Sequence, residues 1–139
     1  VMHGEDQGWE YLVTSECAHA GQRGVRFGPW MYLRTYHGYF HLWPREMLFN
    51  IEQDPYEEHD VAKDHPDICK QASYYLMDWQ DKMMASMPGD VDPLWTVMRE
   101  GGPFHGRGLL PDYCRILEET GRGWAVPELK KRHPSEFGG

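Results

Sequence analysis

The residues of this sequence that are best suited to chemistry are arginines and histidines in a stretch without acids. No Asp or Glu occurs between Cys17 and Arg45, and Arg34, His37 and His41 follow one another closely inside that window. Guanidinium and imidazolium groups bind anions through charge-assisted hydrogen bonds. We therefore predict that these three side chains contact an anionic ligand. The alternative is that Arg34 pairs with a nearby Glu and that the histidines simply lie on the surface.

A second group of candidate contact residues, His105 and Arg107, lies in a glycine-rich segment at 101–108. Glycine lets the backbone approach a ligand closely, so these two side chains are also candidates for substrate contact. The segment is not a nucleotide-binding P-loop, because it lacks the Lys and Ser/Thr that such a loop places on phosphate and magnesium.

No pattern in the sequence indicates a catalytic group or a metal centre. His37 and His41 lie on either side of a predicted glycine turn and not on one helix face, which disfavours a shared metal ion. Cys17, Cys69 and Cys114 form no C-x-x-C pair, so we expect reduced, buried thiols and no structural zinc. We accordingly expect no cofactor on the residues of this chain.

The net charge of −8 is concentrated in the middle of the sequence. Residues 51–100 carry 12 acidic and 4 basic side chains, so the total hides the acid-free window. An acidic chain is not expected to bind nucleic acid, which requires a basic surface. No apolar run approaches the roughly 18 residues of a membrane span, and nothing indicates a compartment.

The elements that must position these groups are, first, strands. β-Branched and aromatic residues predict strands at 10–16, 23–27, 30–36 and 46–51. The connections are short, and the Gly-Pro pair at 28–29 has the length of a tight hairpin turn. Short connections favour a small antiparallel sheet of three to four strands.

The third of these strands has two different faces. Trp30, Tyr32 and Tyr36 alternate onto one face, and Met31 and Leu33 onto the other. If a helix covers one side of the sheet, we expect the aromatic side to remain free. A free aromatic face is typical of a surface that contacts protein or carbohydrate.

After residue 51 the pattern becomes helical. Asp54-Pro55 predicts an N-cap and a helical turn that runs to Ala62. Apolar residues on one face predict a long amphipathic helix at 66–86, packed on the sheet. Residues 90–111 are predicted to be irregular. Two short helices are predicted at 111–120 and 127–133, and a frayed tail at 135–139.

The predicted fold class is therefore α+β, with a sheet-plus-helix subdomain at 1–89 and an extension with a glycine-rich loop and short helices at 90–139. The first unit resembles the C-terminal subdomain of sulfatases. The resemblance is carried by Arg23-Gly-Val-Arg-Phe-Gly-Pro-Trp-Met-Tyr-Leu-Arg34, Glu46-Met-Leu-Phe-Asn50, Asp54-Pro-Tyr-Glu57 and Asp60-Val-Ala62. It is specific over residues 11–85 and looser beyond them.

The resemblance implies a large α/β catalytic domain of the alkaline-phosphatase superfamily as partner within the same polypeptide. That domain is implied to hydrolyse sulfate esters, on a sulfated small molecule or glycan, with a formylglycine and a divalent metal, usually calcium. The formylglycine arises from a C/S-x-P-x-R motif, which is not found here, since Ser86-Met-Pro88 is followed by Asp90 where Arg is required. We expect the chain to be part of a longer protein and inactive alone.

A different interpretation is a freestanding carbohydrate- or protein-binding module that uses its aromatic sheet face. The upstream reading frame discriminates the two interpretations: a C/S-x-P-x-R motif in frame favours the sulfatase, and a start codon just before Val1 favours the module.

Overall fold

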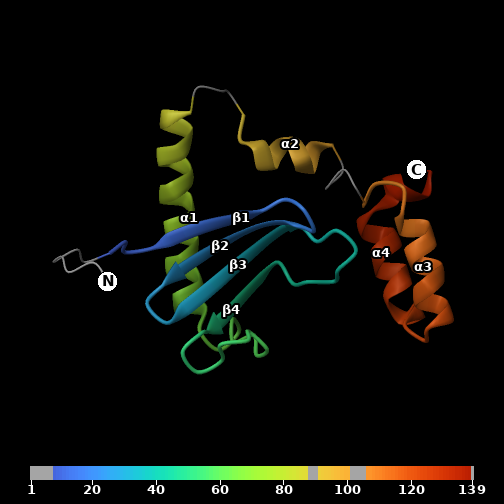
Figure 1. Cartoon of the computed structure of the whole chain (residues 1–139), viewed down its shortest axis with the longest axis horizontal. Coiled ribbons are helices and arrows are strands. Elements are labelled where there is room, and N and C mark those ends of the chain that lie inside the picture. The colour runs from blue at the N-terminus through green and yellow to red at the C-terminus, as the bar shows by residue number, and fades with distance from the viewer. Residues whose placement is uncertain (1–7, 88–90, 101–105, 139) are drawn as a thin grey trace, which may run out of the picture.

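The computed structural model describes residues 8–87, 91–100 and 106–138 and has the predicted α+β architecture (Figure 1). Within these residues, four strands form one sheet, a 21-residue helix packs on it, and shorter helices follow toward the C-terminus. In chain order the elements are β1 (Leu12–Glu16), β2 (Gly21–Phe27), β3 (Trp30–His37), β4 (Glu46–Asn50), α1 (Pro66–Ser86), α2 (Pro93–Arg99), α3 (Leu110–Glu119), η2 (Gly123–Ala125), α4 (Val126–Arg132) and η3 (Pro134–Phe137).

The sheet is antiparallel, with its strands in the order β1-β2-β3-β4. Val25 pairs with Tyr32, and Tyr32 pairs with Leu48, so these side chains share one face. Gly28 begins the β2–β3 turn at φ 50°, a conformation that glycine adopts without steric cost. The short turns therefore produce the predicted antiparallel sheet.

α1 covers the sheet face that carries Val25, Tyr32 and Leu48, which are completely buried in one cluster with Leu76 of the helix. The prediction of a free aromatic face is therefore wrong, because Tyr32 is buried and Trp30 packs against the same cluster. Alternation along a strand separates its two faces but does not say which face the helix covers. Aromatic rings bury more apolar area than other side chains, which favours placing them under the helix.

The segment between β4 and α1 does not form the predicted helical turn. The Asp54 carboxylate accepts hydrogen bonds from the backbone N–H groups of Glu58 at 3.1 Å and His59 at 2.8 Å, as an N-cap does. Glu57 has a φ of 55°, however, and a helix cannot continue through this left-handed conformation. The loop instead places Asp60 so that its carboxylate accepts from the Leu48 N–H of β4 at 3.0 Å.

The stretch predicted to be irregular contains α2. Asp92 is its N-cap, since the Asp92 carboxylate accepts from the Leu94 N–H at 3.0 Å, and Pro93 occupies the first helical position. Asp92 also forms an ion pair with Arg23 of β2 at 2.5 Å. One carboxylate thus begins α2 and fixes it to the sheet.

The C-terminal helices have a small core of their own, formed around Leu110, Leu117 and Leu129 of α3 and α4. Phe40 and Leu42, from the connection between β3 and β4, pack against this core and link it to the sheet. α3 and α4 confirm the two short predicted helices, and η3 occupies the segment predicted as a frayed tail. In the described part of the chain, no helix has both the length and the hydropathy needed to cross a membrane.

Candidate functional site

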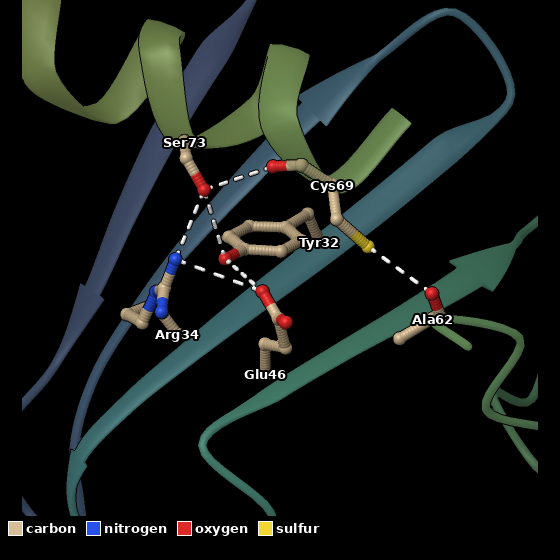
Figure 2. A network of polar contacts seen from close by, with 6 residues as sticks. All are labelled: Tyr32, Arg34, Glu46, Ala62, Cys69 and Ser73. Carbon is tan, nitrogen blue, oxygen red and sulfur yellow. Dashed lines mark hydrogen bonds and ion pairs between the residues drawn. The ribbon is translucent and has the colours of Figure 1, made fainter. Parts of the chain in front are cut away.

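Arg34, the first predicted contact residue, is held inside a polar network between the sheet and α1 (Figure 2). Its Nη2 donates to the Ser73 hydroxyl at 2.9 Å and lies 3.6 Å from the Glu46 carboxylate. The Tyr32 hydroxyl donates to the same carboxylate at 3.0 Å. The network therefore joins β3 and β4 to α1, and Arg34 pairs with a nearby Glu as in the alternative interpretation.

The network continues along α1 through backbone carbonyl groups. The Ser73 hydroxyl donates to the Cys69 carbonyl at 2.8 Å, and the Cys69 thiol donates to the Ala62 carbonyl at 3.6 Å. Burial raises the pKa of the Tyr32 hydroxyl to about 12, so this group keeps its proton and remains a donor at neutral pH. These contacts stabilise the junction of sheet and helix.

A second region with candidate residues lies at the end of β3, where the strand meets the C-terminal helices (Figure 1). A cavity of about 360 Å³ there, which we call the β3-end cavity, is lined by β3, the β3–β4 connection and the end of α4. Its charged, ionisable and aromatic lining residues are Tyr36, His37, Trp43, Arg45, Arg132 and His133. Among the described residues that line it, none is acidic. This composition favours an anionic ligand with a ring that can stack on tryptophan.

The two arginines of the β3-end cavity differ in how they are held. Arg132 is oriented by Glu128, whose carboxylate accepts from Nε at 2.9 Å, and by the Trp43 carbonyl at 3.4 Å. Arg45 is exposed, and its side chain has no ion-pair partner in the part of the chain that the structure describes. Arg45 can therefore bind an anion without first giving up an internal partner.

His37 and His133 lie beside each other, with ring centroids 4.9 Å apart. The Tyr39 N–H donates to His37 Nδ1 at 3.1 Å, which fixes the orientation of that ring. Burial lowers the pKa of both imidazoles, His133 lowers that of His37 further, and Glu136 opposes the change in each. At neutral pH the pair is therefore uncharged, and in acid it adds positive charge to the cavity.

Arg107 lies close to the same histidines. A small cavity beside the β3-end cavity is lined by His37, His133 and Arg107, and Arg107 pairs with Glu100 at 3.1 Å. Gly106 packs so closely on Tyr39 that a Cβ atom there would lie 1.7 Å from a ring carbon. This glycine therefore serves close packing rather than the approach of a ligand.

The structure brings together some of the predicted contact residues. His37 and Arg107 share a cavity, and His41 stacks on Trp43 with ring centroids 4.2 Å apart. Arg34 lines neither cavity that contains His37. His105 lies outside the described residues.

Sequence reasoning did not assign Arg132 or His133 to a site, and it considered Trp43 as a sugar platform and Arg45 as part of the acid-free window without choosing either as a contact residue. The basic run at 130–133 was the available signal, but it also suits the C-terminal end of a helix, where cations stabilise the dipole. Trp43 and Arg132 lie 89 positions apart in the sequence, and only the folded chain shows that they are neighbours.

Within residues 8–87, 91–100 and 106–138, no side chains fit the formylglycine and the calcium that the resemblance implies. Ser86 ends α1, where its hydroxyl donates to the Met83 carbonyl at 3.1 Å. Among the described residues, Asp54, Glu58 and His59 bring possible ligand atoms within 4.8 Å of one another. Asp54 already accepts two backbone N–H groups, and Glu58 and His59 are exposed, so the cluster is explained as a loop cap.

Comparison with solved structures finds a protein that is similar to part of this chain. No protein-family model matches the chain, and no curated protein matches it. A solved structure of a Bacteroides thetaiotaomicron 6S-sulfatase, described with the metabolism of multiple glycosaminoglycans, matches 52% of this chain at 22% identity with a TM-score of 0.45. The match covers 17% of that chain. The chain thus spans about a sixth of the length of that protein.

Proposed function

We propose that this chain is the C-terminal part of a sulfatase-like hydrolase and that its β3-end cavity binds part of the sulfated substrate beside the active site. The hydrolysis itself is assigned to a catalytic domain of the same polypeptide, which supplies the formylglycine and the calcium. The role of this chain is to support that domain and to line the entrance for the substrate.

The observation that carries the proposal is the set of sulfatase-like motifs and the elements on which they lie. Residues 23–34 form the β2–β3 hairpin, residues 46–50 form β4, and residues 54–62 form the loop that Asp54 and Asp60 cap. The motifs thus coincide with the parts of the sheet that determine its register and its connection to α1. A chance resemblance would not be expected to follow the elements in this way.

The chemistry of the β3-end cavity supports the role in substrate binding. A sulfate or uronate group needs cationic donors, which Arg45 and Arg132 offer, and a sugar ring needs a flat apolar partner, which Trp43 offers. The two charged side chains of its lining, Arg45 and Arg132, are both basic.

The proposal is tested by two measurements on the 139-residue chain. We expect no turnover of an aryl sulfate, with or without added calcium. We also expect a sulfated disaccharide to bind more tightly than its desulfated form in a calorimetric titration, with an affinity that falls as salt is added. Turnover free of contaminating enzyme, or equal affinity for the two sugars, would contradict it.

A matched pair of variants locates the binding. Arg45→Ala removes the unpaired guanidinium of the β3-end cavity and should abolish most of the preference for the sulfated sugar. Arg26→Ala removes an exposed arginine of β2 that does not line this cavity and should leave the preference unchanged. The same loss in both variants would indicate attraction by overall charge and not by a site.

A further inference from the structure

A second cavity, with no lining residue in common with the β3-end cavity, is rich in sulfur. It has a volume of about 250 Å³ and lies between β1, the C-terminal half of α1 and the start of α2. Four of its lining residues carry sulfur, namely Cys17, Met83, Met84 and Met87. Trp79, Pro93 and Leu94 make up much of the remaining wall, so the surroundings are mainly apolar. We call it the sulfur cavity.

The sulfur atoms approach this cavity from two elements. Met83 lies in the last turn of α1, and Met87 is the residue that caps its C-terminal end. Cys17 follows β1 and is exposed, whereas Cys69 and Cys114 are buried elsewhere. Methionine has three rotatable bonds, so its thioether can adjust its position within a cavity.

We propose that the sulfur cavity binds one Cu(I) ion through the sulfur atoms of Cys17, Met83 and Met87, with Met84 in reach as a fourth ligand. Thiolate and thioether sulfurs are soft ligands, which select Cu(I) over hard cations. Calcium and magnesium prefer oxygen, so this site differs in chemistry from the calcium that the sulfatase resemblance implies. A Cu(I) thiolate unit carries no net charge, which suits an apolar wall.

A buried cation stands beside the thiol. Arg23 lines the sulfur cavity with a side chain only 6% exposed, and it pairs with Asp92, but its Nε has no hydrogen-bond partner among the described residues. Binding of Cu(I) breaks the S–H bond of Cys17, releases the proton to solvent and forms the Cu–S bond, with no change in the oxidation state of copper.

The test is an anaerobic titration of the 139-residue chain with Cu(I) against bicinchoninate as competing chelator. We expect one Cu(I) per chain. Cys17→Ser should weaken Cu(I) binding by roughly 100-fold. Substituting a residue that only supports a metal ligand weakens binding by up to about 100-fold, so the loss of a direct ligand should cost at least as much. The double variant Met83→Leu/Met87→Leu should weaken it by about tenfold, with its volume and fold preserved.

Two controls make the result decisive. Met77→Leu changes an exposed methionine of α1 that does not line the sulfur cavity, and its affinity should equal that of the parent chain. Cys69 and Cys114 remain in every variant, so tight Cu(I) binding that survives Cys17→Ser would lie on them and would overturn the proposal. Equal affinities of the double leucine variant and the parent, with both folded by circular dichroism, would also overturn it.

Discussion

The buried hydroxyl of Tyr32 joins three elements at the scale of a single residue. Its ring is completely buried under α1, and its hydroxyl donates to Glu46 at 3.0 Å and lies 3.2 Å from the Ser73 hydroxyl. Tyr32→Phe keeps the ring but leaves the Glu46 carboxylate without this donor. We expect the free energy of unfolding to fall by about 1–2 kcal/mol in a urea titration.

Tyr36 provides the control for that substitution on the same strand. Its side chain is 41% exposed, so the hydroxyl of the parent chain is open to water. Tyr36→Phe should therefore leave the free energy of unfolding nearly unchanged. Equal losses in the two variants would show that the network around Glu46 contributes nothing specific.

The histidine pair predicts how stability depends on pH. Burial holds the pKa of His37 and His133 in the folded state below the ordinary value of 6.5. The stability of the folded chain that depends on the uncharged histidines is therefore complete above about pH 6.5. It is lost as the pH falls below that value, because these histidines take up protons more readily in the unfolded chain than in the folded one. We expect the free energy of unfolding to fall between about pH 7 and pH 5.

Variants at one member of the pair check the origin of this slope. His133→Phe keeps a ring beside His37 and removes one titrating group. The loss of unfolding free energy in acid should therefore be smaller, although Glu136 and Arg132, which also act on the pKa of His133, remain in place. His59→Phe alters a side chain that is 78% exposed and should keep the parent slope. A parent-like slope in His133→Phe would refute the assignment.

At the scale of elements, α2 depends on one buried ion pair. The side chains of Arg23 and Asp92 are 6% and 7% exposed, and the carboxylate also caps α2. Asp92→Asn leaves the arginine charge buried without its counter-charge, and we expect a loss of about 3–5 kcal/mol in urea unfolding. Asp112→Asn is the control, since its pair with Arg115 is exposed and should cost less than about 1 kcal/mol.

The elements that could be predicted are those with local signals. α1 begins and ends where the Pro66 start signal and the periodicity place it, and α3 ends before Gly121, whose φ of 75° suits a helix end. α2 carries the same start signal in Asp92-Pro93, but its seven residues show little periodicity. The positive φ of Glu57 has no sequence signal, so the loss of the predicted turn at 54–62 could not be foreseen.

At the scale of the whole molecule, the candidate site could not be read from the sequence, because it lies where two small cores meet. Phe40 and Leu42 leave the sheet to pack on α3 and α4, and this contact brings Arg132 to Trp43. The acid-free window contributes one half of the lining of this cavity, from Thr35 to Arg45. The other half comes from residues near 132, and their approach depends on tertiary packing that no local pattern encodes.

Under the proposed function, the same geometry predicts how a longer sulfatase-like protein should respond if the β3-end cavity holds substrate away from the reacting bond. Arg45 would then bind the ground state and the transition state equally. Arg45→Ala should therefore raise KM by about tenfold, which corresponds to the loss of one charge-assisted hydrogen bond, and should leave kcat within about twofold. Alanine at His37, His41, His105 or Arg107 tests the remaining predicted contacts by the same measurement. Unchanged kcat/KM in all of these variants would restrict the cavity to a structural role, whereas a fall in kcat at constant KM would place Arg45 beside the reacting bond.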